Sequence, residues 1–296
     1  MDSASAQTSR PALKHRYIAT NGVYLHTVQT GPEDGPLAIL LHGFPEFWRG
    51  WQRQLPALTG AGWRVWAPDQ RGYNLSDKPR GLDAYTPDVL AADVKGLIEC
   101  SGRRTVTLVG HDWGGVIAWW ATLNYPHLVQ RLVILNAPHP GVMRRHLLQN
   151  PLQQLRSAYA AFFQLPWLPE QVLGAGNGLG AALLMRLSSR PGAFAARHLQ
   201  PYRRAWRRPR ALHSMLNWYR ALRRASSSQP ATQRVSQPAL IIWGRKDVAL
   251  GPSLAHLSLQ MCDDGRLVYI DEASHWVQHE AAPRVNSLLL NFLGAP

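Results

Sequence analysis

The chain has 296 residues, 46% of them hydrophobic, so it can bury one large core or a core with an inserted unit. Its two cysteines, Cys100 and Cys262, lie far apart and match no metal or redox spacing, which argues against a disulfide-built secreted scaffold. The formal net charge is +14 and is concentrated in one segment in the middle of the chain.

The N-terminal residues carry no recognisable export signal. Residues 1–15, MDSASAQTSRPALKH, have no apolar stretch of signal-peptide length, and no segment elsewhere reaches the roughly 18 apolar residues of a membrane span. No period of repeat length occurs, which argues against a solenoid. We therefore expect a cytoplasmic protein without a membrane span.

Short apolar runs alternate with helical candidates along most of the chain. Asn21-Gly22 lies between two alternating runs and predicts a β-hairpin. Six apolar runs, each bounded by Gly, Pro, Asp or Asn, are typical of buried parallel strands. These runs are LAILLHG (37–43), RVWAPD (64–69), TVTLVGH (105–111), RLVILNAP (131–138), ALIIWG (239–244) and RLVYID (266–271). With helices expected over 86–102 and 116–126, they predict an α/β fold.

The excess charge marks an inserted unit between the fourth and fifth of these runs. Between Gly141 and Val235 there are fifteen arginines, no lysine and one acid, Glu170, whereas the rest of the chain is neutral in sum. This shift in composition predicts two parts of an α/β core, residues 1–139 and 236–296, separated by an insert over 140–235.

The octet VGHDWGGV (109–116) lies directly between a predicted strand and a predicted helix. Such a strand-turn-helix elbow crowds its central residue, so it needs small neighbours, which Gly110 and Gly114 supply. The side chain of Asp112 would then stand at the carboxyl end of the sheet, close to a helix N-terminus. The plain alternative is an aspartate that only caps the helix.

A carboxylate at this elbow restricts the chemistry. A serine that attacks a saturated carbon forms an ether, which water does not cleave, whereas a carboxylate forms an alkyl ester that water can hydrolyse. Asp112 as nucleophile therefore indicates a substrate with an electrophilic sp³ carbon and a leaving group, chiefly an epoxide or an alkyl halide.

The other parts of such a site follow later strands. Asp247 comes directly after the strand 239–244 and His275 lies in the loop after 266–271, so the order nucleophile, acid, base is that of the elbow enzymes. His279 is a rival base, one helical turn further on. The backbone amides of Phe44 and Trp113 are the predicted oxyanion donors. His42 is interpreted as structural.

These motifs together resemble the soluble epoxide hydrolases of the α/β-hydrolase fold. HGFPE, APDQRGY, GHDWGG, NAPHP, WGRKD and SHWVQHE are all similar to that family's marks, and the resemblance runs over nearly the whole chain. It implies Asp112 as nucleophile, Asp247 and His275 as the acid and base, and a mostly parallel twisted sheet with helices on both faces. The insert corresponds to a helical cap, or lid. Asp69 is taken as structural.

The resemblance also bears on the choice between epoxide and halide. An opened epoxide leaves a tethered alkoxide that needs a proton, and a neutral phenol can supply it. Tyr159 and Tyr219 match the ring-opening tyrosines of the family's cap, although each could be an ordinary cap core residue. Phe162 lies where some relatives have a further tyrosine.

A haloalkane dehalogenase-type hydrolase stays the alternative, because related dehalogenases share the aspartate and often the neighbouring tryptophan, here Trp113. Phe44 replaces the asparagine of many of them, and Asn136 replaces the acid that some place after the strand 131–138. A non-catalytic ligand-binding protein on this scaffold would have lost at least one of the predicted catalytic residues, and all of them are present here. We expect an apolar epoxide as substrate and neither a cofactor nor a metal.

Two segments of the insert carry further expectations. RRAWRRPR (203–210) predicts an arginine stripe on a solvated helix face, suited to anionic substrates or an acidic surface. No stacking platform or groove-reading motif accompanies it, so no nucleic-acid partner is expected. GAGNGLGAA (174–182) lacks GxGxxG spacing, follows no strand and is predicted to be a flexible lid loop.

Overall fold

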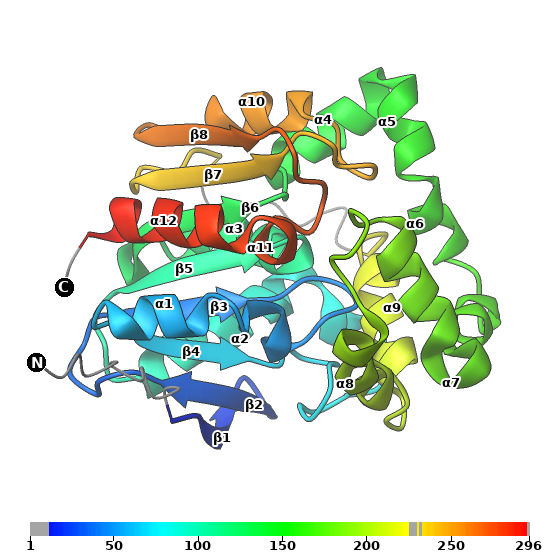
Figure 1. The fold of residues 1–296 in the computed structure, drawn as a ribbon, viewed down its shortest axis with the longest axis horizontal. Coiled ribbons are helices and arrows are strands. Elements are labelled where there is room, and N and C mark those ends of the chain that lie inside the picture. The colour runs from blue at the N-terminus through cyan, green and yellow to red at the C-terminus, as the bar shows by residue number, and fades with distance from the viewer. Residues whose placement is uncertain (1–11, 225–229, 231–232, 295–296) are drawn as a thin grey trace, which may run out of the picture.

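Eight strands form one sheet at the centre of the molecule (Figure 1). The structure is a computed structural model that describes residues 12–224, 230 and 233–294. In spatial order the strands run β1-β2-β4-β3-β5-β6-β7-β8. Their bounds are β1 Lys14–Thr20, β2 Val23–Thr30, β3 Leu37–Leu41, β4 Arg64–Pro68, β5 Val106–His111, β6 Val129–Leu135, β7 Ala239–Gly244 and β8 Gly265–Ile270.

The hairpin lies at one edge of this sheet, as predicted. Strands β1 and β2 pair antiparallel, and β2 also pairs antiparallel with β4, whereas the pairings from β4 to β8 are parallel. Asn21 and Gly22 have φ of 44° and 73°, the left-handed geometry that the tight turn requires. The predicted α/β fold is confirmed.

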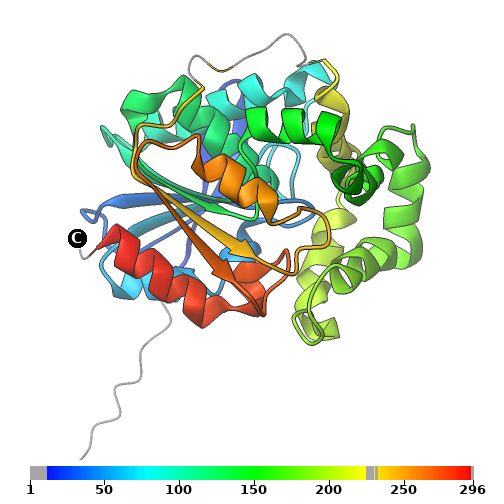
Figure 2. The same ribbon diagram turned by 90° about the horizontal axis from the view of Figure 1, so that it is seen from above.

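Helices cover both faces of the sheet. Helices α1 and α12 lie on one face, and α2, α3 and α10 lie on the other (Figures 1 and 2). The bounds of the helices around the sheet are η1 Trp48–Trp51, α1 Leu55–Gly60, η2 Asp83–Tyr85, α2 Pro87–Cys100, α3 Trp113–Asn124, η3 Pro126–Leu128, α10 Ser253–Leu259, α11 Val277–Glu280 and α12 Ala282–Leu293. The core is formed where the fully buried strands β3 and β5 meet α3.

A second group of helices lies between β6 and β7 in the chain and covers the carboxyl ends of the strands (Figure 1). We call these helices the cap. They are α4 Pro140–Gln149, α5 Pro151–Arg156, α6 Ala158–Phe162, α7 Leu168–Leu187, α8 Ala196–Trp206 and α9 Ala211–Ala221. The predicted insert over 140–235 remains a domain prediction, and the part of it at residues 225–229 and 231–232 lies outside the described residues, as do residues 1–11.

One local prediction in the cap was right only in part. The segment 174–182 is a loop only at Ala175–Gly178, where the backbone leaves helical geometry and separates two helical halves of α7. Gly176, Asn177 and Gly178 have φ of 58°, 59° and 83°, which small or amide residues tolerate, and helical geometry resumes at Leu179.

The arginine stripe at 203–210 is solvated as predicted, since Arg204, Arg207, Arg208 and Arg210 are exposed and Arg203 is half-buried, but it does not lie on one helix. Arg203 donates to the carbonyl oxygens of Gly176 and Asn177, at 2.8 and 3.0 Å, so it supports the kink in α7. Arg208 donates to Asn74 Oδ1 at 3.0 Å, a contact with the core. Helix α8 ends at Trp206, before the second half of the stripe. Among the described residues, no helix is both long and apolar enough to cross a bilayer.

Candidate active site

Asp112 lies in the sharp turn between β5 and α3. Its φ of 50° and ψ of −122° are strained for a residue with a side chain. A Cβ at Gly110 would collide with the carbonyl oxygen of Gly114, and one at Gly114 would collide with that of Leu41. The side chain of Asp112 makes no helix-capping hydrogen bond, so the capping interpretation is wrong. The turn instead presents the carboxylate beyond the end of the sheet.

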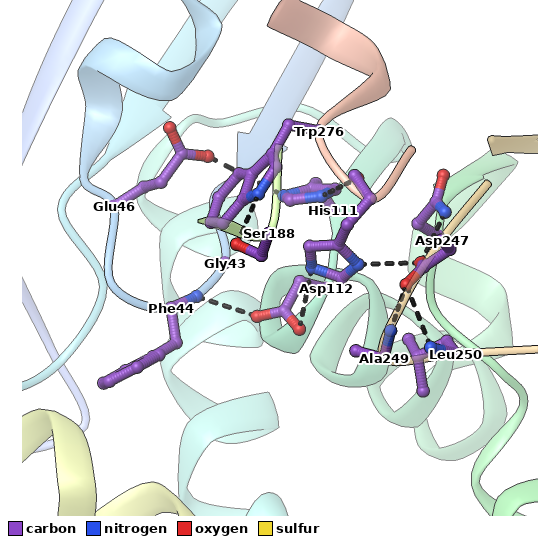
Figure 3. Close-up of polar contacts among 12 residues, drawn as sticks. Gly43, Phe44, Glu46, His111, Asp112, Ser188, Asp247, Ala249, Leu250 and Trp276 are labelled. Carbon is purple, nitrogen blue, oxygen red and sulfur yellow. Dashed lines mark hydrogen bonds and ion pairs between the residues drawn. The ribbon is translucent and has the colours of Figure 1, made fainter. Parts of the chain in front are cut away.

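Two side chains that are far from Asp112 in the sequence, those of His275 and Asp247, form a row with its carboxylate. Figure 3 labels the two carboxylates of this row. Nε2 of His275 lies 3.5 Å from Asp112 Oδ2, and its Nδ1 lies 2.8 Å from Asp247 Oδ2. All three residues follow the carboxyl ends of parallel strands, β5, β7 and β8. The structure therefore brings together the predicted nucleophile, acid and base in one hydrogen-bonded row.

The carboxylate of Asp247 is held by donors on both oxygens. Oδ1 accepts from the amides of Ala249 and Leu250 at 2.8 and 2.9 Å, and Oδ2 accepts from Asn136 Nδ2 at 2.7 Å. These bonds keep Asp247 an acceptor, so Nδ1 of His275 donates to it and Nε2 is left to face Asp112.

Asn136 is a supporting residue that the sequence reasoning missed. It follows β6 with a φ of 43°, and its Oδ1 accepts from the amide of Gly244 at 3.0 Å. The side chain of Asn136 thus connects the end of β6 with the end of β7 and with Asp247 in the loop after β7. The only sequence signal for Asn136 is its position after a predicted strand, where some dehalogenases have an acid.

The charges in this row shift the pKa values in opposite directions. Burial by itself would raise the pKa of Asp112, but the hydrogen bond and charge of His275 and the amide of Phe44 lower it below the usual range. Burial would likewise lower the pKa of His275, but the charges and hydrogen bonds of Asp247 and Asp112 raise it well above its usual value. The resting site therefore favours an ionised Asp112 beside a protonated His275.

The backbone after β3 approaches the same carboxylate. The amide of Phe44 donates to Asp112 Oδ1 at 2.8 Å (Figure 3). A Cβ at Gly43 would lie 2.6 Å from Asp112 Oδ1, so glycine is needed for this approach. Trp113 is the first residue of α3, directly after Asp112. The two predicted oxyanion donors, the amides of Phe44 and Trp113, thus belong to segments next to the carboxylate of Asp112.

Tyr159 from α6 and Tyr219 from α9 meet on the cap side of the elbow. Their ring centroids are 6.1 Å apart, and both rings contact Phe163. The ring of Tyr219 also packs edge-on against Phe44 and Trp113, with centroids 5.3 and 5.0 Å apart. Phe162 packs on Phe163 and is partly buried. The cap therefore places two phenols over the residues that flank Asp112.

Both phenols are held in their protonated form. Burial raises the pKa of Tyr159 far above its usual value, and the charge of Asp112 raises it further. Burial also raises the pKa of Tyr219, assisted by the neighbouring Tyr159 and by Asp112. At neutral pH each side chain is a hydrogen-bond donor.

A buried polar cluster lies behind His275. Nε2 of His111 donates to the carbonyl oxygen of His275 at 2.9 Å, and its Nδ1 accepts from Gln278 at 3.0 Å. Burial, with the nearby charge of His275, lowers the pKa of His111 to about 4, so His111 is neutral and keeps this tautomer. Glu46 accepts from Gln278 at 3.0 Å and from His279 at 2.7 Å. His279 is therefore bound to Glu46, and it is His275 that faces Asp112.

His42 and Asp69 support the loops around the site. Nε2 of His42 accepts from the amide of Gln70 at 3.0 Å, and its Nδ1 donates to the carbonyl oxygen of Gly43 at 3.0 Å. Asp69 accepts from the amide of Trp48 at 3.1 Å. These contacts agree with the structural interpretation of both side chains.

The cap is bonded to the two loops that carry the acid and the base. Gln153 of α5 donates to the carbonyl oxygen of Ala249 at 2.7 Å and accepts from the amide of Gly251 at 3.0 Å. Ser188, directly after α7, accepts from the indole of Trp276 at 3.0 Å (Figure 3). None of these cap residues was predicted to act at the site, because their partners lie about 90 residues further along the chain.

Known proteins match this chain over most of its length. It matches the alpha/beta hydrolase fold family over residues 36–282. It is 45% identical over 282 residues to AB hydrolase superfamily protein YfhM of Bacillus subtilis, which covers 95% of this chain and 98% of that protein. Human epoxide hydrolase 4 is 35% identical over 283 residues, covering 93% of this chain and 77% of the human protein.

A solved structure agrees with these sequence matches. A mutant of an epoxide hydrolase from Bacillus megaterium, complexed with its product, a naphthyloxy-propane-1,2-diol, has a TM-score of 0.86. The match covers 94% of this chain and 99% of that one, at 35% identity. The chain therefore belongs to the α/β-hydrolase fold family and, within it, to the epoxide hydrolases.

Proposed function

We propose that the protein hydrolyses an apolar epoxide to a vicinal diol through a covalent ester on Asp112. The observation that carries this proposal is the meeting of two protonated phenols, Tyr159 and Tyr219, with an aspartate elbow that His275 faces. The carboxylate suits attack on a saturated carbon, and the phenols suit a leaving oxygen that needs a proton. The relatives named as epoxide hydrolases support the same substrate class.

In the first step, Tyr159 and Tyr219 hydrogen-bond the epoxide oxygen while a carboxylate oxygen of Asp112 attacks a ring carbon. A carbon–oxygen bond forms to Asp112 and the ring carbon–oxygen bond breaks. The alkoxide takes a proton from one tyrosine, which gives a hydroxyalkyl ester and a tyrosinate. The lowered pKa of Asp112 keeps the nucleophile ionised for this step.

In the second step, His275 removes a proton from water, which attacks the carboxyl carbon of Asp112. The amides of Phe44 and Trp113 hold the oxyanion, and Asp247 orients and stabilises the imidazolium. His275 then protonates the departing diol oxygen, and the proton released by ester hydrolysis returns to the tyrosinate. The cycle consumes one epoxide and one water and forms one diol.

A single-turnover experiment in heavy-oxygen water tests the covalent route. With enzyme in excess over epoxide, the diol formed in the first turnover should carry no heavy oxygen, because its new oxygen comes from Asp112. Mass spectrometry of the peptide around Asp112 should then show the label in the carboxylate. Heavy oxygen in the first-turnover diol would mean direct attack by water and would remove the ester from the mechanism.

Substitution of both tyrosines by phenylalanine should abolish ring opening. The variant Tyr159→Phe/Tyr219→Phe keeps both rings but supplies no proton, so we expect kcat for epoxide opening to fall by about 10²- to 10⁴-fold. The measurement is diol formation under saturating substrate. Tyr269→Phe is the matched control, because the hydroxyl of Tyr269 donates to the carbonyl oxygen of Pro252 near β8, away from the elbow. If the double variant were as active as this control, the hydroxyl groups of Tyr159 and Tyr219 would have no part in ring opening, and the two rings would serve for packing alone.

Haloalkane hydrolysis is the second candidate, and Trp113 is the observation that favours it. Trp113 directly follows the proposed nucleophile and its ring packs against that of Tyr219, so its indole N–H is a candidate donor for a departing halide. Diol formation from a set of epoxides, measured beside halide release from a set of haloalkanes, separates the two activities. Halide release without diol formation would replace epoxide hydrolysis as the proposal.

A further inference from the structure

Exposed apolar side chains gather on the cap rather than over the whole surface. Eleven of the fifteen exposed large apolar residues of the described chain lie between residues 148 and 222. They are Leu148, Leu152, Leu155, Leu165, Trp167, Leu168, Val172, Leu179, Leu183, Leu187 and Leu222. Single exposed leucines are common on soluble proteins, but a concentration of this kind marks an interaction surface.

Helix α7 carries the clearest part of this surface. Leu179, Leu183 and Leu187 follow the spacing i, i+4 and i+8 after the kink, so they share one side of the helix. Leu187 is 75% exposed. The opposite side of the helix is already buried in the cap through other residues, among them Met185. The packing of this helix in the cap therefore does not use the three exposed leucines.

The segment before the kink adds an aromatic residue. Trp167 precedes the first residue of α7 and is 64% exposed, and Leu168 and Val172 follow it, both exposed. Tryptophan combines a large apolar ring with a polar N–H, and it is enriched where protein meets the headgroup region of a bilayer. Exposed apolar side chains thus occur on both halves of α7, before and after the kink. We call them together the α7 face, which comprises Trp167, Leu168, Val172, Leu179, Leu183 and Leu187.

The same part of the chain is strongly basic. Of the charged residues between 141 and 235, fifteen are arginines and one is an acid. That acid, Glu170, is already bound by Arg220 at 2.6 Å and by His213 at 3.0 Å. Arg224 and Arg234 pair with Asp83 and Asp263 outside the segment, at 2.7 and 2.6 Å. Other arginines of the segment, among them Arg204, Arg207 and Arg210, are exposed, so the segment attracts an anionic surface.

An open polar groove lies where the kink of α7 meets α8. It has a volume of about 230 Å³ and is lined by Asn177, Gln200, Arg203, Arg204 and Arg207. Arg203 is held in place by its bonds to the carbonyl oxygens of Gly176 and Asn177. Guanidinium groups bind phosphate oxygens in a bidentate manner, so this groove suits a phosphate-bearing headgroup.

We propose that the cap docks on the surface of an anionic phospholipid bilayer, with the α7 face in the headgroup region and the arginine groove on lipid phosphate. Leucine and tryptophan beside arginine are the composition of surface-bound amphipathic helices. A second copy of the chain fits less well, because pairing two caps would bring two strongly basic segments together. A nucleic acid would satisfy the arginines but would leave the leucines in water.

Vesicle co-sedimentation of the full chain tests the proposal without any assay of catalysis. We expect binding to vesicles that contain phosphatidylglycerol to be at least about ten-fold tighter than to pure phosphatidylcholine, and to weaken as salt rises. Brominated acyl chains should quench part of the tryptophan fluorescence, and Trp167→Phe should remove most of that quenching. This experiment can fail while epoxide hydrolysis holds, and the reverse is also true.

Two groups of variants separate the apolar and the charged parts. Leu179→Gln/Leu183→Gln/Leu187→Gln should weaken vesicle binding at least about ten-fold, since glutamine keeps the helix propensity but not the apolar face. Arg203→Gln/Arg204→Gln/Arg207→Gln should remove the preference for anionic lipid. Tyr17→Ser/Tyr24→Ser is the matched control, because these equally exposed residues lie on β1 and β2, away from the cap. Thermal melting checks that each variant folds.

Five results would overturn the proposal. Three concern vesicles: no binding at low salt, equal binding to neutral and anionic vesicles, and unchanged binding by the leucine variant. A fourth is a dimer in light scattering that the leucine variant dissociates, which would assign the α7 face to a second copy. Heparin binding as tight as vesicle binding, and unaffected by the leucine substitutions, would reduce the surface to a polyanion site and would also reject a bilayer.

Discussion

Asp112→Asn should reduce diol formation by at least about 10⁴-fold, the largest single loss that the proposed mechanism predicts. An amide has almost the shape of a carboxylate, and its oxygen can still accept from the amide of Phe44, so the elbow should keep its geometry. The amide is not a nucleophile, and therefore no ester forms. Steady-state diol formation from a turnover substrate is the measurement.

The same variant should also change the titration of His275. Asp112 is one of two carboxylates whose charges raise the pKa of His275, so its neutralisation should lower that pKa towards the usual value. Proton NMR of the imidazole follows this shift independently of activity. Turnover within ten-fold of the parent enzyme, in a variant with an intact fold, would exclude Asp112 as the nucleophile.

His275→Gln should stop the cycle after its first half. Glutamine cannot take a proton from water, so we expect kcat to fall by about 10³- to 10⁴-fold while Asp112 is still alkylated. The ester should accumulate to one equivalent per enzyme. Intact-protein mass spectrometry should show the mass of the enzyme plus one substrate. Rapid turnover, or complete absence of the adduct with a reactive epoxide, would contradict the role of His275 in ester hydrolysis.

In the proposed mechanism, the position of His275 between two carboxylates lets it serve as a base only after the ester has formed. In the resting site, Asp112 and Asp247 together favour the protonated imidazole. In this mechanism, formation of the ester removes the charge of Asp112, so the pKa of His275 falls, its proton passes to solvent, and the neutral base becomes available. Asp112 would thus control the protonation of His275 through its own charge.

The sheet and the elbow could be predicted from the sequence because their signals are local. The strands β3, β5, β6 and β7 are apolar runs bounded by Gly, Pro, Asp or Asn, and they are buried as those runs indicate. The turn at Asp112 needs Gly110 and Gly114, and both lie within two residues of it. Asp247 and His275, the predicted acid and base, were identified because they lie in the loops after two predicted strands, β7 and β8.

The residues that the sequence did not reveal act through contacts between distant segments. Asn136 reaches Asp247 from 111 residues away, and Glu46 binds His279 from 233 residues away. No local pattern distinguishes these side chains from ordinary polar residues. The helix that resumes at Leu179 escaped prediction for the opposite reason. A run of glycines indicates a loop, whereas the residues after Gly178 form a helix that buries Ala181, Ala182 and Met185.

The bonds from Gln153 and Ser188 to the loops of Asp247 and His275 have a consequence for attempts to exchange parts between relatives. The cap is not a separable module that only selects the substrate, because Gln153 and Ser188 hydrogen-bond to the segments that carry Asp247 and His275. A chimera that takes its cap from another enzyme must import matching hydrogen bonds as well. Without these hydrogen bonds, the loops of Asp247 and His275 would be held less firmly and the rate would fall. That loss could be mistaken for a poor fit of the substrate in the new pocket.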